Sequence, residues 1–229
     1  MKILGIDTAT NICGVALTED RRLLTEIRLN FRRAHAEKLI DAIDTVLKET
    51  SIVLNDIDAI AISIGPGSFT GLRIGLATVK GFAFANELPV VAVNTLDALA
   101  NQAILWKGQI CALIRAQADE AYAAFFRSKG FLQERMSNYQ LVDLNRFQHI
   151  IKEETLVVHA GINEVNRYLS NENGKLITIA PESACLLSGG TIARLGYEKF
   201  KLGKTEPIDT LEPYYLKEFK VKLKGGRSV

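Results

Sequence analysis

A glycine-rich loop holds the residues whose types and spacing are most suited to chemistry: Ile64-Gly65-Pro66-Gly67-Ser68-Phe69-Thr70-Gly71-Leu72-Arg73-Ile74-Gly75. The loop follows an apolar run and precedes an apolar-periodic one, so we expect a buried strand that turns sharply into a helix. Such a turn directs backbone N–H groups and the positive end of the helix dipole toward one point, which suits an anion. A tight turn without a ligand explains the same glycines. The loop matches neither the Walker A motif nor the dinucleotide GxGxxG motif.

Asp7 is a second candidate, at the end of a short apolar run and just before Thr8-Ala9-Thr10. Its carboxylate can take part in catalysis, or it can accept the N–H groups of Ala9 or Thr10 and only form the turn. The histidines are scattered singly, with no second histidine or cysteine at ligand spacing, so the sequence predicts no metal site. They are His35, His149 and His159.

Strand and helix patterns alternate along the first half of the chain, which must position these residues. We predict strands over residues 2–7, 12–18, 23–29, 57–64 and 90–93. We predict helices over residues 36–48, 71–86 and 96–105. On the first of these helices one apolar face is expected, formed by Leu39, Ile40, Ile43, Val46 and Leu47.

The second half begins like the first when the sequence is shifted by about 108 residues, which aligns Gly5-Ile6-Asp7 with Leu113-Ile114-Arg115. Strands are predicted over 110–115, 120–127, 132–134, 139–142 and 156–158, and helices over 144–152, 162–169 and 183–200. A duplication predicts two lobes, residues 1–106 and 107–216, with a ligand cleft between them. The alternative is a chance likeness of two three-stranded meanders. Residues 217–229 form a basic tail, which we interpret as a solvated end.

Composition restricts the function classes. The chain has 229 residues and a formal net charge of +2, with a hydrophobic fraction of 48%. These values are typical of one or two globular domains and do not favour a module that binds nucleic acid by its own charge. No run resembles a signal peptide or a membrane span. The three cysteines are far apart and read as reduced thiols, so we expect a cytoplasmic protein. They are Cys13, Cys111 and Cys185.

Several motifs resemble a known family. Residues 5–10, followed by a second strand, resemble the first phosphate turn of the actin-like, sugar-kinase and Hsp70 superfamily. The loop at 65–75 is similar to that of the TsaB (YeaZ) family within it. Three further segments fit: His35-Ala36-Glu37-Lys38-Leu39, Asp119-Glu120-Ala121-Tyr122 and Pro213-Tyr214-Tyr215-Leu216. The resemblance extends from residue 2 to about residue 216. It implies an α/β, two-lobed actin-like ATPase (ribonuclease H-like) fold with duplicated mixed-sheet subdomains.

The resemblance also implies a reaction. TsaD, the catalytic relative, transfers a threonylcarbamoyl group onto the adenosine beside the tRNA anticodon, with a metal held by two histidines in Val-Asn-His-x-x-x-His. The corresponding segment here begins Val93-Asn94, and Thr95 and Leu99 stand at the histidine positions. A threonine is a poor metal ligand and a leucine is none. We therefore expect no metal and no independent catalysis, but a non-catalytic subunit that binds and activates TsaD.

Nucleotide binding is a weaker implication of the same resemblance. The superfamily's kinases position magnesium with acidic residues on the first turns of both lobes. Asp7 stands at one of these turns, but Arg115, a cation, stands at the other. The candidate nucleotide or phosphate contacts are Asp7, Thr8, Thr10, Gly65, Pro66, Gly67 and Ser68. No cofactor is expected for this chain alone, and ATP or ADP stays a candidate ligand. Alternative functions are an ATPase or small-molecule kinase, or a metallopeptidase-like protein.

The partner interface is expected on the first helix and on the helix that follows the glycine loop. The candidate contacts are His35, Lys38, Leu39, Ala42, Arg73, Ala77, Lys80, Gly81 and Phe84. Small residues on the second helix would let another helix approach closely. They can also serve to pack this helix on its own sheet. The expected partners are TsaD, the ATPase TsaE as a third subunit, and a second copy of the chain, with tRNA bound only through the complex and no membrane contact.

Overall fold

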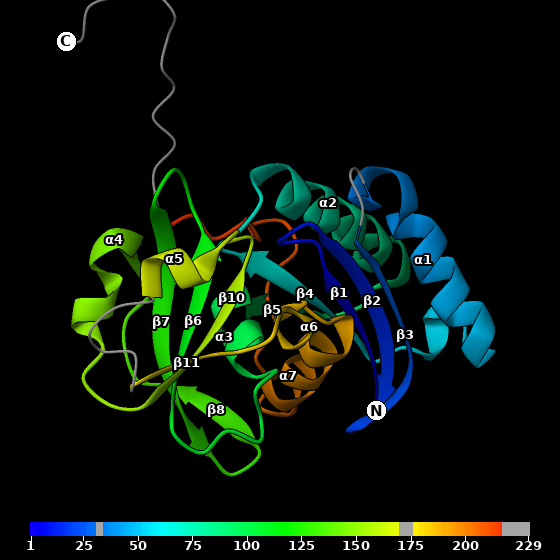
Figure 1. The fold of residues 1–229 in the computed structure, drawn as a ribbon. Coiled ribbons are helices and arrows are strands. Elements are labelled where there is room, and N and C mark those ends of the chain that lie inside the picture. The colour runs from blue at the N-terminus through cyan, green and yellow to red at the C-terminus, as the bar shows by residue number, and fades with distance from the viewer. Residues whose placement is uncertain (31–33, 170–175, 217–229) are drawn as a thin grey trace, which may run out of the picture.

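The computed structural model describes residues 1–30, 34–169 and 176–216, without the side chains of residues 34–36. The predicted basic tail, residues 217–229, lies outside the described residues. The chain forms two mixed sheets with helices packed against them (Figure 1). This arrangement confirms the predicted α/β class and the duplication of mixed-sheet subdomains.

The N-terminal sheet has the order β3-β2-β1-β4-β5. Its strands are β1 (Lys2–Asp7), β2 (Ile12–Glu19), β3 (Arg22–Asn30), β4 (Ala59–Gly65) and β5 (Val90–Asn94). The first three strands form an antiparallel meander, whereas β4 and β5 run parallel to β1. The carboxyl ends of β1, β4 and β5 therefore meet at one edge, where Asp7 and the glycine loop lie.

The C-terminal sheet repeats this order as β8-β7-β6-β10-β11, with β9 added on β7. Its strands are β6 (Gln109–Arg115), β7 (Glu120–Lys129), β8 (Leu132–Arg135), β9 (Gln140–Asp143), β10 (Thr155–Ala160) and β11 (Ile177–Ile179). Asp7 ends β1 and Arg115 ends β6, so the shift of 108 residues aligns equivalent positions. The sequence patterns did not reveal β11, which is only three residues long.

The N-terminal sheet is covered on both faces. Helices α1 (Ala34–Thr50) and α2 (Phe69–Asn86) lie side by side on one face, and α7 (Gly189–Lys201) covers the other (Figure 1). The short helix α3 (Thr95–Ala100) instead packs mainly on β6, β7, β8 and β10 of the C-terminal sheet. Each sheet thus receives a helix from the opposite half of the chain, and one apolar core joins the two lobes.

Several helices are shorter than the sequence patterns predict. The predicted helix 96–105 ends at Ala100, because the Asn101 amide turns back to donate to the carbonyls of Asp97 and Gln133. The predicted helix 183–200 divides into α6 (Glu182–Cys185) and α7, since the Ser188 hydroxyl caps the second helix at the Thr191 N–H. The remaining short helices are η1 (Leu54–Asp56), α4 (Leu144–Phe147), η2 (Gln148–Ile150) and α5 (Val165–Leu169).

Close contact between α7 and the N-terminal sheet depends on glycine. A Cβ atom on Gly5 would overlap the Gly189 carbonyl oxygen, and a Cβ on Gly189 would lie 2.8 Å from the Ala16 nitrogen. A Cβ on Gly196 would meet the Ala61 side chain. These glycines allow the helix backbone to approach β1, β2 and β4 directly.

Two glycine-to-alanine replacements should therefore have opposite effects on stability. Gly5→Ala is expected to lower the free energy of unfolding by about 2–3 kcal/mol, because the added methyl group collides with backbone. Gly81→Ala is expected to raise it by about 1 kcal/mol, since Gly81 lies inside α2 and open space surrounds its missing Cβ. Urea titration monitored by circular dichroism measures both. Equal effects of the two variants would contradict the packing described here.

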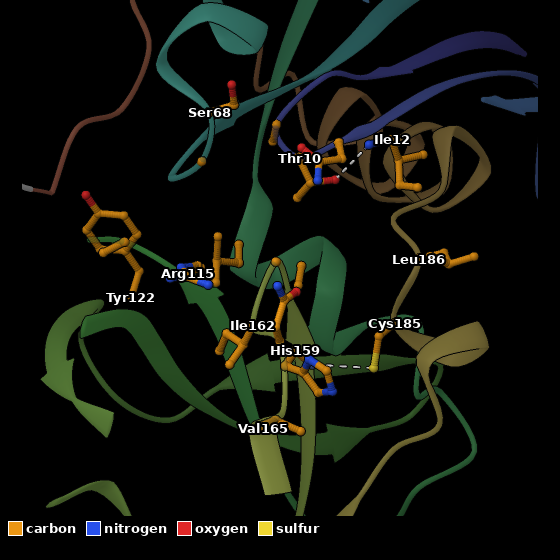
Figure 2. A pocket seen from close by; sticks show the side chains of 18 of the residues that line it. Thr10, Ile12, Ser68, Arg115, Tyr122, His159, Ile162, Val165, Cys185 and Leu186 are labelled. Carbon is orange, nitrogen blue, oxygen red and sulfur yellow. Dashed lines mark hydrogen bonds between the residues drawn. The ribbon is translucent and has the colours of Figure 1, made fainter. Parts of the chain in front are cut away.

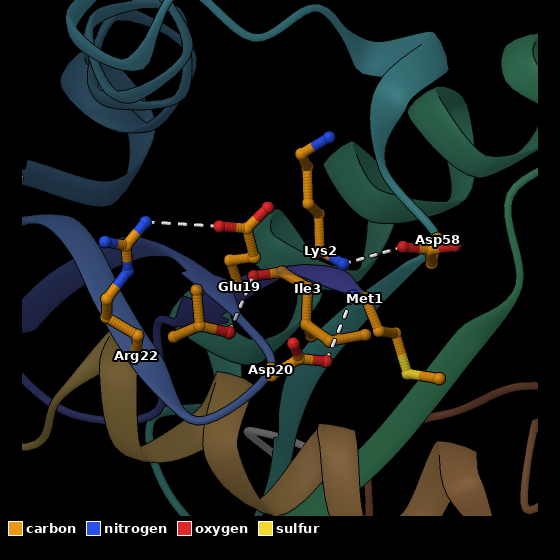
Figure 3. A network of polar contacts seen from close by, with 8 residues as sticks. Met1, Lys2, Ile3, Glu19, Asp20, Arg22 and Asp58 are labelled. Carbon is orange, nitrogen blue, oxygen red and sulfur yellow. Dashed lines mark hydrogen bonds and ion pairs between the residues drawn. The ribbon is translucent and has the colours of Figure 1, made fainter.

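Polar contacts hold the start of β1 (Figure 3). The N-terminal ammonium group is 3.1 Å from Asp20 Oδ1, and the Lys2 N–H donates to Asp58 Oδ2 at 2.6 Å. Arg22 pairs with Glu19 at 3.1 Å beside them. Met1 is thus tied to the β2–β3 turn, and Lys2 to the segment that enters β4.

After α7 the chain forms an extended strap, residues 205–216, which crosses the N-terminal lobe (Figure 1, red). The Glu206 N–H donates to the Val90 carbonyl at the edge of β5, and Lys80 of α2 donates to the Asp209 carbonyl. Farther on, the Tyr214 N–H donates to the Ile64 carbonyl at 2.7 Å. The strap therefore ends beside the glycine loop.

Candidate functional site

A cleft of about 1780 Å³ lies between the lobes. Figure 2 shows Thr10, Ser68 and Ile12 on the N-terminal side of it, with Arg115, His159 and Ile162 opposite. The lining comes from the β1–β2 turn, the glycine loop, the β6–β7 turn, the β10–α5 loop, the segment before α7 and the end of the strap. Equivalent turns of the two repeated halves thus face each other across the opening, as the duplication predicts.

The glycine loop packs against the first turn. The Ser68 N–H donates to the Ala9 carbonyl at 2.7 Å, and the Ser68 hydroxyl caps α2 by accepting the Gly71 N–H at 3.2 Å. Cβ atoms on Gly67 and Gly71 would overlap the carbonyl oxygens of Ala9 and Thr8. Internal contacts therefore account for these glycines, which favours the tight-turn interpretation of the motif.

The seven candidate phosphate contacts separate into two groups. Thr10, Gly67 and Ser68 line the cleft. The other four lie behind it and are buried: Asp7, Thr8, Gly65 and Pro66. Gly65 has a φ of 116°, and a Cβ there would lie 2.6 Å from the Tyr214 carbonyl oxygen, so it serves the contact with the strap.

Asp7 is fully buried at the end of β1. Its Oδ1 accepts the Ala9 N–H at 3.4 Å, whereas its Oδ2 has no hydrogen-bond partner among the described residues. Burial raises the pKa of this carboxyl from 3.8 to about 6, although hydrogen bonds with Ser63 and Ala9 oppose the increase. The turn-forming contact predicted for Asp7 is therefore present, and its second oxygen is not satisfied.

The C-terminal wall of the cleft carries Arg115, which is exposed and forms no ion pair with a described residue. His159 and Cys185 also lie there, and the backbone N–H of His159 donates to the Cys185 sulfur at 3.4 Å (Figure 2). Burial lowers the pKa of His159 and raises the pKa of the Cys185 thiol. At neutral pH this pair is a neutral imidazole beside a thiol, which is not an activated nucleophile.

The two residues at the expected histidine positions lie in α3 and are fully buried. Leu99 is part of the core shared by the lobes. The Thr95 hydroxyl has no hydrogen-bond partner among the described residues. A leucine offers no donor atom to a metal, so this helix presents at most one weak ligand. Cys13, Cys111 and Cys185 are buried free thiols, as predicted.

The candidate partner residues on α1 and α2 also separate by exposure. Arg73, Ala77 and Gly81 form an exposed row four residues apart on α2, with Phe84 beyond them at 78% exposure. On α1, Lys38 is exposed, whereas Leu39 and Ala42 are buried in the core of the lobe. Lys80 is half-buried and contacts the strap. The side chain of His35 lies outside the described residues.

One residue of the predicted buried face of α1 points the other way. Ile40 is 63% exposed, while Leu39, Ile43 and Val46 are buried as predicted. Ile40 follows the buried Leu39 by one position. In a helix with 3.6 residues per turn, this places its side chain at the edge of the apolar stripe. It therefore adds an apolar side chain to the exposed side of α1, the helix that packs beside α2. We call the exposed side of these two helices the α1–α2 face and define it by Lys38, Ile40, Arg73, Ala77, Gly81 and Phe84.

Comparison with known proteins identifies the family. The model of the family "TsaD: tRNA N6-adenosine threonylcarbamoyltransferase" matches residues 27–194. The tRNA threonylcarbamoyladenosine biosynthesis protein TsaB of Escherichia coli strain K12 is 30% identical over 95% of both chains. The chain belongs to the TsaB family of tRNA threonylcarbamoyladenosine biosynthesis proteins. This agrees with the resemblance seen in the glycine loop.

Solved structures agree with this assignment to the TsaB family. YeaZ from Pseudomonas aeruginosa superimposes with a TM-score of 0.79 at 25% identity, over 94% of this chain and 99% of that one. A ROK hexokinase from Thermus thermophilus has a TM-score of 0.51 at 13% identity, over 89% of this chain and 100% of that one. The second likeness shows that the fold is that of the actin-like ATPases.

The sequence patterns missed part of the cleft. His159 was not among the candidate site residues, but it lies in β10 and lines the cleft. Phe69 and Tyr215 also line it, from segments far apart in the sequence. The only signal that could have indicated Tyr215 was its place in the Pro213-Tyr214-Tyr215-Leu216 motif. None of the helices formed by the described residues combines the length and the apolarity that a bilayer crossing requires.

Proposed function

We propose that this protein is a non-catalytic subunit that binds a TsaD-type transferase and so supports threonylcarbamoylation of the adenosine beside the tRNA anticodon. The observation that carries the proposal is the α1–α2 face. Ala77 and Gly81 leave the backbone of α2 open to a close neighbour, and Phe84 and Ile40 add exposed apolar area beside them.

The length of this face supports a protein partner. The 18 residues of α2 span about 27 Å at 1.5 Å per residue, which is enough for much of an ordinary interface. Gly71 and Gly75 contact Thr8 inside the molecule, whereas Gly81 contacts nothing there. The small residues of α2 therefore serve two faces, and only the outer set needs a partner. In the absence of TsaD, the same face would accept a second copy of the chain.

The chemistry of the chain's own residues supports an accessory role. Leu99 cannot bind a metal, Asp7 does not line the cleft, and the equivalent position in the second lobe is the cation Arg115. No pair of carboxylates faces across the cleft at these two turns. The chemistry would then belong to the TsaD-type partner, in the cytoplasm, and any role of a TsaE-type ATPase would require the assembled complex.

Reconstitution tests this proposal. A transferase of the TsaD type from the same organism, with tRNA, threonine, bicarbonate, ATP and the enzyme that makes the threonylcarbamoyl adenylate, should modify tRNA only when this protein is added. This protein should also elute together with the transferase in size-exclusion chromatography. Modification at an equal rate without this chain, or modification by this chain in place of the transferase, would refute the proposal.

A further inference from the structure

Four aromatic rings form two contacting pairs, each with an arginine stacked on one ring, and consecutive residues of the strap contribute one ring to each pair. The Arg73 guanidinium is 3.8 Å from the centre of the Phe69 ring, which is 5.6 Å from the Tyr215 ring. Tyr214 precedes Tyr215 in the strap, and its ring is 5.8 Å from the Tyr139 ring. The Arg135 guanidinium lies 4.0 Å from Tyr139. We call this set the aromatic row: Arg73, Phe69, Tyr215, Tyr214, Tyr139 and Arg135.

The aromatic row is accessible and carries positive charge. Tyr214 and Tyr215 are 38% and 42% exposed, and both arginines are exposed. Neither arginine forms an ion pair with a described residue. The sequence that follows Leu216 adds five basic residues and one acidic residue, and this charge begins directly after the strap. Exposed aromatic rings together with unpaired guanidinium groups favour a polyanion with planar groups.

We propose that the aromatic row binds a single-stranded segment of RNA, with bases stacked on Tyr214 and Tyr215 and with phosphates at Arg73 and Arg135. The inference rests on the proposed function, because it takes the tRNA of that reaction as the RNA. Stacking on tyrosine tolerates any base, and a guanidinium group can bind a phosphate through two N–H groups. The row would therefore hold a loop without reading its sequence.

Contacts within the protein hold the Tyr139 ring and the strap backbone at Tyr214 in place before any ligand binds. The Tyr139 hydroxyl donates to the partly buried carboxylate of Asp97 at 2.8 Å. The Tyr214 N–H is held by the Ile64 carbonyl, and its own carbonyl lies against Gly65. Preorganised side chains lose little conformational entropy on binding, so exposed rings held in this way suit a binding surface.

The position of the row fits the proposed complex. Arg73 belongs both to the row and to the α1–α2 face, so RNA on the row would lie next to the bound transferase. The other end reaches Arg135, the last residue of β8 in the opposite lobe. An RNA segment along the row would thus cross from the partner side to the C-terminal lobe, past the mouth of the cleft that Phe69 and Tyr215 line.

Binding of a fluorescein-labelled anticodon stem-loop RNA to the assembled complex tests the inference by fluorescence anisotropy. Tyr215→Ala should raise the Kd about ten-fold, which is the loss expected for one base stack. Tyr215→Phe keeps the ring and should leave the Kd unchanged. Phe131→Ala is the matched control, because Phe131 is 75% exposed and its ring lies 5.6 Å from the Arg21 guanidinium, which is not part of the row. Arg135→Gln should reduce the slope of log Kd against log salt concentration by about 0.7.

Three results would overturn the inference. Equal RNA binding by the Tyr215→Ala complex and the unchanged complex would refute the row as an RNA site. Loss of co-elution with the transferase in this variant would make the row a protein interface. A lower melting temperature of this variant with an unchanged Kd for RNA would show that the aromatic row stabilises the contact between the lobes and does not bind RNA. Failure of the proposed function is distinct, since the unchanged chain would then not form the complex at all.

Discussion

Asp7→Asn should raise the free energy of unfolding at pH 7.5 by up to about 3 kcal/mol. This is the free energy that corresponds to the shift of about two units in the pKa of the Asp7 carboxyl when the protein folds. The carboxyl is fully buried and its pKa is raised from 3.8 to about 6. Between these two values the folded protein binds a proton that the unfolded chain has released. Stability therefore falls as pH rises from about 4 to 6, and the whole penalty is present above pH 6. An asparagine carries no charge at any of these pH values.

Urea titrations of the two proteins from pH 4 to pH 8 measure this effect. The curves should coincide near pH 4, where Asp7 is protonated in the folded state, and separate as the pH rises through 6. Asp58→Asn is a control at an exposed carboxylate, which accepts the Lys2 backbone N–H. An Asp7→Asn protein that is no more stable at pH 7.5 would show that the carboxylate has an electrostatic partner. Modification of tRNA by the reconstituted system should persist in this variant, whereas its loss in a folded protein would favour the ATPase alternative.

Gly81→Arg combined with Phe84→Asp should weaken the complex with the transferase at least about 100-fold, as loss of a central interface contact does. The arginine would fill the open space at Gly81 and prevent a partner helix from approaching α2. The aspartate would place a charge where 78% of an aromatic side chain is exposed. Modification of tRNA should fall in proportion, because the transferase would act without its partner.

Isothermal titration calorimetry with the transferase measures the affinity, and circular dichroism shows whether α2 is intact. Phe131→Asp is the matched control, because Phe131 has a similar exposure of 75% but belongs to the turn between β7 and β8. This control should bind like the unchanged protein. Full affinity of the double variant would place the interface elsewhere, even though membership of the TsaB family would stand.

The sequence predicted the parts of the fold that depend on local pattern. Strand β1 was predicted with the bounds that the structure has, and α2 begins two residues before its predicted start. The repeat correctly paired Asp7 with Arg115, because each ends the central strand of its sheet. Alternation and helical spacing are properties of neighbouring residues, so they can be recognised without knowledge of the tertiary structure.

Features that depend on contacts between distant segments could not be predicted in this way. Burial of Asp7 follows from packing over the end of β1, not from its own neighbours. The aromatic row joins residues from α2, the β8–β9 segment and the strap, and no periodicity links them. Ile40 fits an apolar pattern, yet only the arrangement of α1 on the sheet decides that it is exposed. The sequence therefore indicated which helices form the candidate interface, whereas the structure was needed to show which of their residues are exposed.

The two halves of the chain exchange helices α3 and α7, as the subunits of a domain-swapped dimer exchange elements. Helix α3 of the first half packs mainly on the C-terminal sheet, and helix α7 of the second half packs on the N-terminal sheet. A protein cut between residues 106 and 107 should thus yield fragments that are unstable when separate and complement each other when mixed. Each half keeps a core on the outer face of its sheet, but the core between the two sheets needs residues from both halves and is incomplete in either fragment alone.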